Sequence, residues 1–310
     1  MTRALITGIT GQDGSYLADL LLARGYEVHG LARSTKPIER VQVHEGDMRD
    51  QESLTRALAA ARPDEVYNLA AISSVAASWE HPALTGDVTG LGVARLLEAL
   101  HTTCPEARLV QASSNEIFGA ASGGSADEST PLAPRTPYGA AKAYAHHLVR
   151  GHREAYGLFV CAAILFNHES PRRPPRFVTR KITRGAAAIS LGQADELRLG
   201  TLDPRRDWGY APDFVEAMWL MLQRKQPEDY VVATGVAHSV RDCVAVAFEH
   251  VGLDWREHVK LDDALKRPAE SEPLVGDASK ARRELGWHPR TDFEEMITLM
   301  VDHDLAQLRT

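Results

Sequence analysis

The first half of the chain alternates short apolar runs with longer stretches in which apolar residues recur every three or four positions. Short apolar runs between turn residues are typical of buried strands, and the longer periodic stretches are typical of helices. Strands that alternate with helices pair in parallel through right-handed crossovers. We therefore predict an α/β fold with a doubly wound parallel sheet, the Rossmann architecture. The predicted strands are residues 4–7, 26–32, 41–44, 65–68, 107–110 and 158–165, and the predicted helices are residues 15–24, 52–62, 91–100 and 138–156.

A second region begins after Phe166, where the segment SPRRPPRFVTRKITR is rich in proline and arginine. From Ser239 onward the chain is charged and mainly helical in its periodicity. Segments 212–222 and 229–233 have the patterns of a helix and a strand that return to the first sheet. We predict a Rossmann domain of residues 1–167 with 211–236, and a smaller, mainly helical C-terminal substrate domain of residues 168–210 and 237–310.

Composition narrows the possible partners. The 310 residues are 44% hydrophobic and carry a formal net charge of -7, which disfavours a general nucleic-acid surface. The three cysteines, Cys104, Cys161 and Cys243, are widely spaced and form neither a disulfide framework nor a metal-binding pattern. The N-terminus lacks the pattern of a signal peptide, and no apolar run approaches the roughly 18 residues of a membrane helix. We expect a cytoplasmic protein without a membrane segment or a bound metal.

Three glycines, Gly8, Gly11 and Gly14, lie between the first predicted strand and the first predicted helix. Glycines at this junction allow a tight turn and a close approach of the backbone to a pyrophosphate, which the helix N-terminus then stabilises. The spacing is Gly-x-x-Gly-x-x-Gly, so a plain structural turn is the alternative. The position at the first strand–helix junction favours a dinucleotide loop that also includes Gln12 and Asp13.

The end of the second predicted strand indicates which dinucleotide binds. NAD-binding units usually carry an acidic residue there, whereas this chain has Arg33 and Ser34. A cation and a hydroxyl suit a 2′-phosphate, so NADP is the predicted cofactor, unless Arg33 is an ordinary surface arginine. Asp47, followed by Met48, is placed to accept from an adenine amino group or to cap a turn.

The segment QASSNEIFG follows the fifth predicted strand, and Tyr138 and Lys142 stand one helical turn apart at the start of the next helix. A nearby ammonium favours the phenolate, so we expect Lys142 to lower the pKa of Tyr138. Ser114 would then bind the substrate hydroxyl that Tyr138 deprotonates. Glu116 adds a second base, which suits proton abstraction next to a ketone. The alternatives are an exposed helix turn for the Tyr/Lys pair and a solvated loop carboxylate for Glu116.

The glycine trio, the Ser/Tyr/Lys set and the divided second domain together resemble the extended short-chain dehydrogenase/reductase family. Within it, the chain is similar to the GDP-mannose 4,6-dehydratases in strings that cover nearly its whole length. These strings are TGITGQDGSYLADLLLARGYEVHG, PYGAAKAYA, ILFNHESPRR, FVTRKITRG, RRDWGYAPDFVEAMWLMLQ and DYVVATG.

The resemblance implies a role for individual residues. The catalytic set is Ser114, Glu116, Tyr138 and Lys142. The implied NADP contacts are Gly8, Gly11, Gln12, Asp13, Gly14, Arg33, Ser34, Asp47, Met48, Leu69, Ala70, Ala71, Tyr138, Lys142, His168 and Arg173. The implied sugar-nucleotide contacts are Ser73, Ser114, Glu116, Asn167, Val178, Lys181, Arg206, Arg267 and Glu270. The basic run from Arg172 to Arg184, which contains no acid, agrees with binding of phosphate groups.

Departures from the family pattern bear on mechanism and assembly. Ser114 stands where a threonine is usual, which keeps the hydroxyl. Asn115 stands where some related dehydratases carry an aspartate, so Glu116 is expected to act alone as both base and acid. The arm after the second strand, which reaches a neighbouring subunit in tetramers, is cut to ARSTKPIER. We expect a homodimer through the helix that carries Tyr138, with a tetramer as the alternative.

The function implied is a hydro-lyase reaction. Bound NADP takes hydride from carbon 4 of GDP-mannose and returns it to carbon 6, giving GDP-4-keto-6-deoxymannose, and Glu116 mediates the loss of water between carbons 5 and 6. The alternatives are a dehydratase, 4-reductase or epimerase acting on another nucleotide sugar, such as a GDP-heptose, and a non-catalytic NADP-sensing protein.

Overall fold

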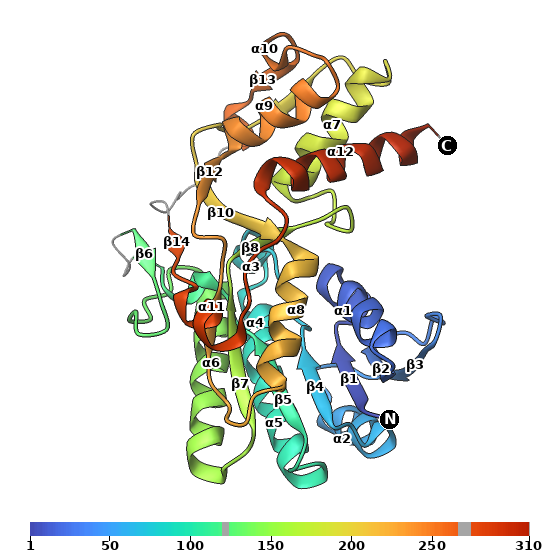
Figure 1. The fold of residues 1–310 in the computed structure, drawn as a ribbon, viewed down its shortest axis with the longest axis vertical. Helices are drawn as coiled ribbons and strands as arrows, with labels where there is room; N and C mark the ends of the chain where they lie inside the picture. Colours follow the sequence, from blue (N-terminus) through green and yellow to red (C-terminus); the bar gives the residue numbers. More distant parts are fainter. Residues whose placement is uncertain (120–123, 266–273, 310) are drawn as a thin grey trace.

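The computed structural model describes residues 1–119, 124–265 and 274–309, which form two lobes, one above the other in Figure 1. The lower lobe is built on seven parallel strands in the order β11-β7-β5-β4-β1-β2-β3, which confirms the predicted doubly wound sheet. The strand order reverses between β1 and β4, the place where such sheets bind nucleotides at the carboxyl ends of their strands. The strands are β1 (Arg3–Thr7), β2 (Glu27–Ala32), β3 (Val41–Glu45), β4 (Glu65–Asn68), β5 (Arg108–Ala112), β7 (Val160–Leu165) and β11 (Tyr230–Val232).

The central strands are buried on both faces. Every residue of β4 and β7 is buried, which explains why these segments lack the alternation of a half-exposed strand. Helices α2 (Gln51–Ala61), α5 (Gly92–Thr103) and α6 (Pro137–Tyr156) share one hydrophobic cluster with the sheet. Helices α1 (Gln12–Ala23), α8 (Ala211–Leu222) and α11 (Ser279–Leu285) share the other cluster.

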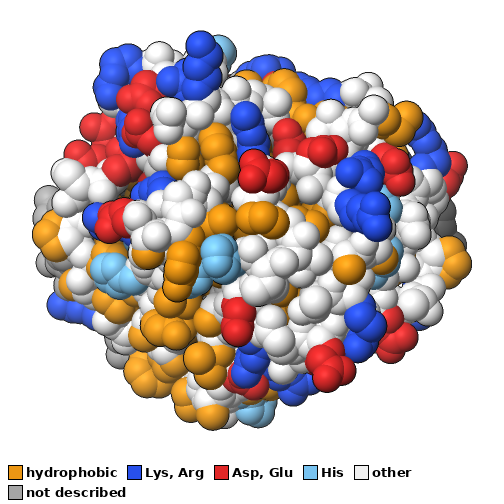
Figure 2. Space-filling model, turned by 90° about the horizontal axis from the view of Figure 1, so that it is seen from below, with side chains coloured by type: hydrophobic (Ala, Val, Ile, Leu, Met, Phe, Trp, Pro, Cys, Tyr) orange, Lys and Arg blue, Asp and Glu red, His pale blue; other side chains and the backbone are white. Residues whose placement is uncertain are grey.

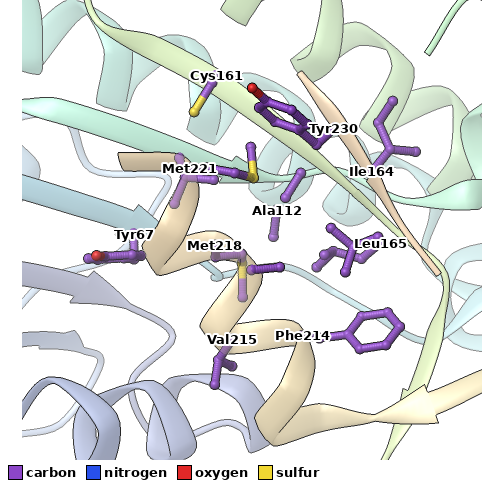
Figure 3. Packing of buried hydrophobic residues seen from close by; sticks show 14 of the residues in the cluster. Tyr67, Ala112, Cys161, Ile164, Leu165, Phe214, Val215, Met218, Met221 and Tyr230 are labelled. Atoms are coloured by element: carbon purple, nitrogen blue, oxygen red, sulfur yellow. The ribbon is translucent and has the colours of Figure 1, made fainter. Parts of the chain in front are cut away.

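Helix α8 shows how the second part of the chain returns to the first sheet. Phe214, Met218 and Met221 recur at helical spacing and are each at most 1% exposed. They point from α8 toward side chains of the strands, among them Ala112 and Leu165 (Figure 3). Helix α8 therefore packs on the first sheet.

The sequence prediction missed the elements between β4 and α5. Two short helices, α3 (Val75–Glu80) and α4 (Pro82–Thr85), lead into a π-helical turn, η1 (Gly86–Leu91), which packs against α6. Beyond β5, a 3₁₀ turn, η2 (Asn115–Ile117), precedes α6. The short strands β6 (Ser125–Ala126) and β14 (Val275–Gly276) pair in parallel.

The upper lobe is mainly helical and has its own hydrophobic cluster, which includes Ile182, Val244, Phe248 and Met296. Helices α7, α9 and α12 pack on one another, and a three-stranded sheet of order β12-β10-β8 lies beneath them (Figure 1). The elements are β8 (Asn167–Glu169), α7 (Val178–Ser190), β9 (Leu197–Leu199), β10 (Arg205–Tyr210), β12 (Ala237–Ser239), α9 (Val240–His250), α10 (Trp255–His258), β13 (Val259–Leu261), η3 (Asp263–Leu265) and α12 (Phe293–Leu308).

Across residues 1–119, 124–265 and 274–309, no helix combines the length and the apolar character that spanning a bilayer requires. Within the same ranges, no three metal-ligating side chains of His, Cys, Asp or Glu lie close enough together to hold an ion.

Candidate active site

The glycine loop brings the backbone of three segments into close contact. Gly8 has a φ of +68°, a left-handed conformation, and a Cβ there would lie 2.9 Å from the backbone nitrogen of Ala70. A Cβ on Gly14 would lie only 2.4 Å from the carbonyl oxygen of Gly8. Gly11, the N-cap of α1, offers no side-chain cap, so the first backbone N–H groups of the helix stay available to an anion. These features fit a pyrophosphate cradle.

The loop that follows β4 is held beside the glycine loop. The Thr7 hydroxyl accepts from the backbone N–H groups of Leu69 and Ala70, both at 3.1 Å. Two residues on, the N–H of Ile72 donates to the Thr89 hydroxyl of the π-helical turn at 3.1 Å. The predicted cofactor residues Leu69, Ala70 and Ala71 are therefore fixed at the switch point of the sheet.

Asp13 and His168 join the glycine loop to strand β8. The two ring nitrogens of His168 face the carbonyl oxygen of Phe166 at 2.7 Å and the Asp13 carboxylate at 2.9 Å. Both partners only accept, so a His168 ring that carries a proton on each nitrogen satisfies both. Burial alone would lower the pKa of His168, but the Asp13 charge and hydrogen bond raise it above 6.5. Burial alone would raise the pKa of Asp13, but His168 lowers it to about 2.

Gln12 strengthens the same connection. Its side-chain amide donates to the carbonyl oxygen of His168 at 3.1 Å and accepts from the Ser170 hydroxyl at 2.8 Å. The predicted cofactor residues Gln12, Asp13 and His168 thus form one network across the two lobes. Arg173 belongs to the same region, since its charge affects the pKa of both Asp13 and His168.

The end of the site next to β2 is exposed and charged. Arg33 and Ser34 are both solvent-exposed. The Asp47 carboxylate accepts two side-chain hydrogen bonds from Arg49, at 3.0 and 2.8 Å, and Arg49 and Arg33 both lower its pKa, to about 2. Met48 is buried in the core below, so its side chain supports the loop from beneath.

Ser114, Tyr138 and Lys142 come together at the carboxyl end of β5. Ser114 is the N-cap of η2, and its hydroxyl accepts from the N–H of Glu116 at 3.3 Å and hydrogen-bonds Tyr138. The Lys142 ammonium donates to the Ala112 carbonyl at 2.6 Å and lies 5.8 Å from the centre of the Tyr138 ring. The three predicted catalytic side chains are therefore neighbours, and all are buried.

The expected lowering of the Tyr138 pKa by Lys142 is wrong for the chain by itself. Burial raises the pKa of Tyr138 to about 12; the hydrogen bond from Ser114 and the charge of Arg173 oppose this rise, and the charge of Glu116 adds to it. Burial also lowers the pKa of Lys142 to about 8, because desolvation disfavours its ammonium form. For both groups, burial is the largest cause of the shift in pKa.

Glu116 lies against the first turn of α6. One oxygen of its carboxylate accepts from the Thr136 hydroxyl at 3.3 Å. A Cβ on Gly139 would lie 2.6 Å from the Glu116 carbonyl oxygen, so only glycine permits this approach. The solvated-loop alternative for Glu116 is wrong, because the residue is partly buried and docked on the helix that carries Tyr138.

Four of the candidate sugar-nucleotide residues lie on the upper lobe, namely Asn167, Val178, Lys181 and Arg206. Asn167 on β8 pairs in register with Trp208 on β10, the strand that also carries Arg206. Val178 is the first residue of α7, whose N-cap, Phe177, provides no side-chain cap, and Lys181 lies one turn further on. Ser73, in the loop before α3, is exposed. Arg267 and Glu270 lie outside the described residues.

The basic run does not act as one phosphate-binding surface. Arg180 is turned into the upper lobe, where it donates to Asp304 of α12 at 3.0 and 2.7 Å. Arg172 pairs with Asp19 at 2.7 Å and lies over the Tyr16 ring. Arg173 lies 3.0 Å from the Glu169 carboxylate and over the Phe177 ring. Within this run, these three arginines already have protein partners.

Sequence reasoning missed Thr136, Gly139, Thr89 and Arg49. A threonine directly before a Pro-Tyr helix start is an N-cap signal, so Thr136 could have been found. Thr89 could not, because the π-helical turn that carries it has no sequence signature of its own.

The parallel sheet with its glycine loop and its Ser/Tyr/Lys cluster is that of an extended short-chain dehydrogenase/reductase. UDP-glucose 4-epimerase from Thermus thermophilus, solved as a complex with NAD, is 32% identical with a TM-score of 0.85, covering 98% of this chain and 99% of that chain.

The sequence identifies the family within this class. The family model described as GDP-mannose 4,6 dehydratase matches residues 5–300, and the chain belongs to this family. GDP-mannose 4,6 dehydratase 1 of Arabidopsis thaliana is 49% identical over 97% of this chain and 89% of the relative. The human GDP-mannose 4,6 dehydratase is 45% identical over 99% of this chain and 92% of the relative.

Proposed function

We propose that this protein is a hydro-lyase that converts GDP-mannose to GDP-4-keto-6-deoxymannose with tightly held NADP. The observation that carries the proposal is the docking of Glu116 on the helix turn that presents Tyr138. Oxidation of an alcohol needs one base, whereas elimination of water next to the new ketone needs a second. A carboxylate that stands beside the tyrosine as a second base supports the dehydratase over a simple reductase or epimerase.

The residues divide the proton transfers between them. Tyr138 takes the proton from the hydroxyl on carbon 4, and Ser114 hydrogen-bonds the same oxygen. The chemistry that NADP supplies when bound is hydride uptake from carbon 4, its later return to carbon 6, and a positive ring that favours the Tyr138 phenolate. Glu116 takes the proton from carbon 5 and gives one to the hydroxyl leaving carbon 6, so water departs. Asn115 offers no acid, so Glu116 performs both transfers.

We propose NADP rather than NAD as the cofactor. The uncapped start of α1 would hold the pyrophosphate, and Arg33 with Ser34 would hold the 2′-phosphate. Arg49 adds a second cation at this end of the site. Arg33 and Arg49 both lower the pKa of Asp47, so both lie near its carboxylate. No acidic residue stands at the end of β2 in place of Arg33.

The same reasoning supports the position of the substrate. The uncapped N-terminus of α7 at Val178 and the Lys181 ammonium would bind the diphosphate of the nucleotide sugar. Asn167 and Arg206, on neighbouring parts of β8 and β10, would contact the nucleotide. This division of labour fits a cofactor domain of residues 1–167 with 211–236 and a substrate domain of residues 168–210 and 237–310. The two lobes have separate hydrophobic clusters, although α11 (Ser279–Leu285) packs in the cluster of the cofactor domain and not in that of the substrate domain.

We also propose that the protein works as a homodimer. Trp79, Leu91 and Tyr144 are 63%, 47% and 44% exposed, and they lie on α3, η1 and α6. Leu91 and Tyr144 line a shallow hollow of about 360 Å³. Viewed from below, hydrophobic side chains gather toward one edge of the molecule (Figure 2). Light scattering should give twice the chain mass for the wild type and the chain mass for Tyr144→Arg; a wild-type tetramer or monomer would refute the dimer.

A reducing compartment such as the cytoplasm suits the three unpaired cysteines.

The function is tested by incubating the purified protein with NADP and a panel of nucleotide sugars. We expect a 4-keto product that has lost water from GDP-mannose, with no net consumption of cofactor. Glu116→Gln should bind NADP as tightly as the wild type and form no such product. Stoichiometric consumption of NADPH would indicate a reductase, and a product that keeps the hydroxyl on carbon 6 would indicate an epimerase; either result contradicts the proposal.

A further inference from the structure

Thr136 occupies a junction between two parts of the candidate site. It is the N-cap of α6 and directly precedes Pro137, the first residue of the helix. Its hydroxyl accepts from the N–H of Gly139 at 2.9 Å, which is the usual capping bond. The same hydroxyl donates to the Glu116 carboxylate at 3.3 Å. A hydroxyl has one hydrogen and two lone pairs, so both bonds form at once.

The backbone of Glu116 meets the same turn. A Cβ on Gly139 would lie 2.6 Å from the Glu116 carbonyl oxygen, so the main chain of Glu116 packs closely on α6. Glu116 therefore contacts α6 through both its main chain and its side chain. Tyr138 and Lys142 stand on this first part of α6. The helix start therefore holds the base for oxidation and the acid/base for elimination in one rigid unit.

We propose that Thr136 is a positioning residue that aims the Glu116 carboxylate at carbons 5 and 6 of the sugar. This inference rests on the proposed dehydratase function. The Thr136 hydroxyl holds one oxygen of the Glu116 carboxylate in place. Loss of this hydrogen bond weakens the hold on the carboxylate, which slows the loss of water without slowing the oxidation of carbon 4. Capping of the helix and the hydrogen bond to Glu116 are separate functions, so a suitable substitution can remove the hydrogen bond and keep a stable helix start.

Three substitutions separate these functions. Thr136→Ser keeps both the cap and the donor. Thr136→Gly keeps a stable helix start, since glycine is about as good an N-cap as threonine, but it has no hydroxyl to donate to Glu116 and adds no charge beside it. Thr136→Val keeps the shape and loses both. In single-turnover experiments, absorbance at the wavelength of reduced nicotinamide follows the oxidation of carbon 4, and chemical quench with mass analysis follows the loss of water.

We expect Thr136→Ser to match the wild type in both steps. Thr136→Gly should unfold within about 2 °C of the wild-type temperature and oxidise carbon 4 at a rate within about threefold of the wild type. Its water loss should slow about 10–100-fold, the equivalent of one hydrogen bond to a charged group. Thr136→Val should show the same slow water loss and a lower unfolding temperature.

Normal water loss in Thr136→Gly, or an equal slowing of both steps, would overturn the proposal and leave Thr136 as a helix cap only. Glu116→Gln distinguishes this failure from failure of the proposed function. If Glu116→Gln still loses water at the wild-type rate, the role of Glu116 itself is wrong. If Glu116→Gln is inactive in water loss while Thr136→Gly is normal, only the positioning role is wrong.

Discussion

Replacement of Arg180 by methionine tests whether this arginine stabilises the fold or binds phosphate. The side chains of Arg180 and Asp304 are 5% and 0% exposed, and the guanidinium donates twice to one carboxylate oxygen. The Thr183 hydroxyl donates to the other oxygen at 2.8 Å. Arg180→Met would leave Asp304 buried with a single neutral donor. Breaking a buried ion pair in this way costs about 3–5 kcal/mol.

Thermal unfolding measures this cost. At about 2–4 °C per kcal/mol for a chain of this size, we expect the unfolding temperature to fall by about 6–20 °C. Calorimetry on the folded protein should find an unchanged affinity for GDP-mannose. The matched control is the neighbour Lys181→Met, which should keep its unfolding temperature within about 2 °C and lose affinity.

A second variant checks the physical reason. Arg180→Met combined with Asp304→Leu removes both charges, and apolar replacement of a buried ion pair is often neutral or stabilising. We expect the pair of substitutions to recover most of the lost stability. An unchanged unfolding temperature together with lost affinity in Arg180→Met would refute the reasoning and restore Arg180 to the phosphate site.

Three further results are expected. Gly14→Ala should weaken NADP binding at least about tenfold, because the added Cβ would lie 2.4 Å from the Gly8 carbonyl oxygen. Gly151→Ala is the control, since a Cβ there meets no atom within 4 Å, and it should bind NADP normally; equal NADP binding by both variants would refute the close-approach argument. The raised pKa of His168 makes its pair with Asp13 stabilising below about pH 6.5, and this contribution is lost as pH rises through the pKa of the folded state. The difference in unfolding temperature between the wild type and Asp13→Asn should therefore be smaller at pH 9 than at pH 6, and a larger difference at pH 9 would contradict this sign. Arg33→Asp should raise the Kd for NADP and not that for NAD, measured by fluorescence titration; an unchanged ratio would exclude Arg33 from the 2′-phosphate site.

The sheet and the glycine loop could be predicted because their signals are local. Fully buried runs such as Val160–Leu165 have the composition of a central strand wherever they occur, and a glycine trio between a strand and a helix has few other uses. Pairing of Ser114 with Tyr138 also followed from topology, since successive carboxyl ends of parallel strands meet at one edge.

The direction of single side chains could not be predicted. Arg180 and Lys181 are adjacent in sequence, but neighbours on a helix point about 100° apart, so one meets Asp304 and the other does not. Which one turns inward depends on α12, more than a hundred residues away in the chain. The pKa of Tyr138 failed as a prediction for a related reason: a Tyr-x-x-x-Lys spacing shows that the charges are close but not that both are buried.

The central claim is that one active site oxidises carbon 4, eliminates water and returns the same hydrogen to carbon 6. The most direct test is GDP-mannose labelled with deuterium on carbon 4, incubated with the wild-type protein and NADP and analysed by nuclear magnetic resonance and mass spectrometry. The account predicts product that carries the deuterium on carbon 6. Deuterium released to solvent, or retained on carbon 4, would contradict it.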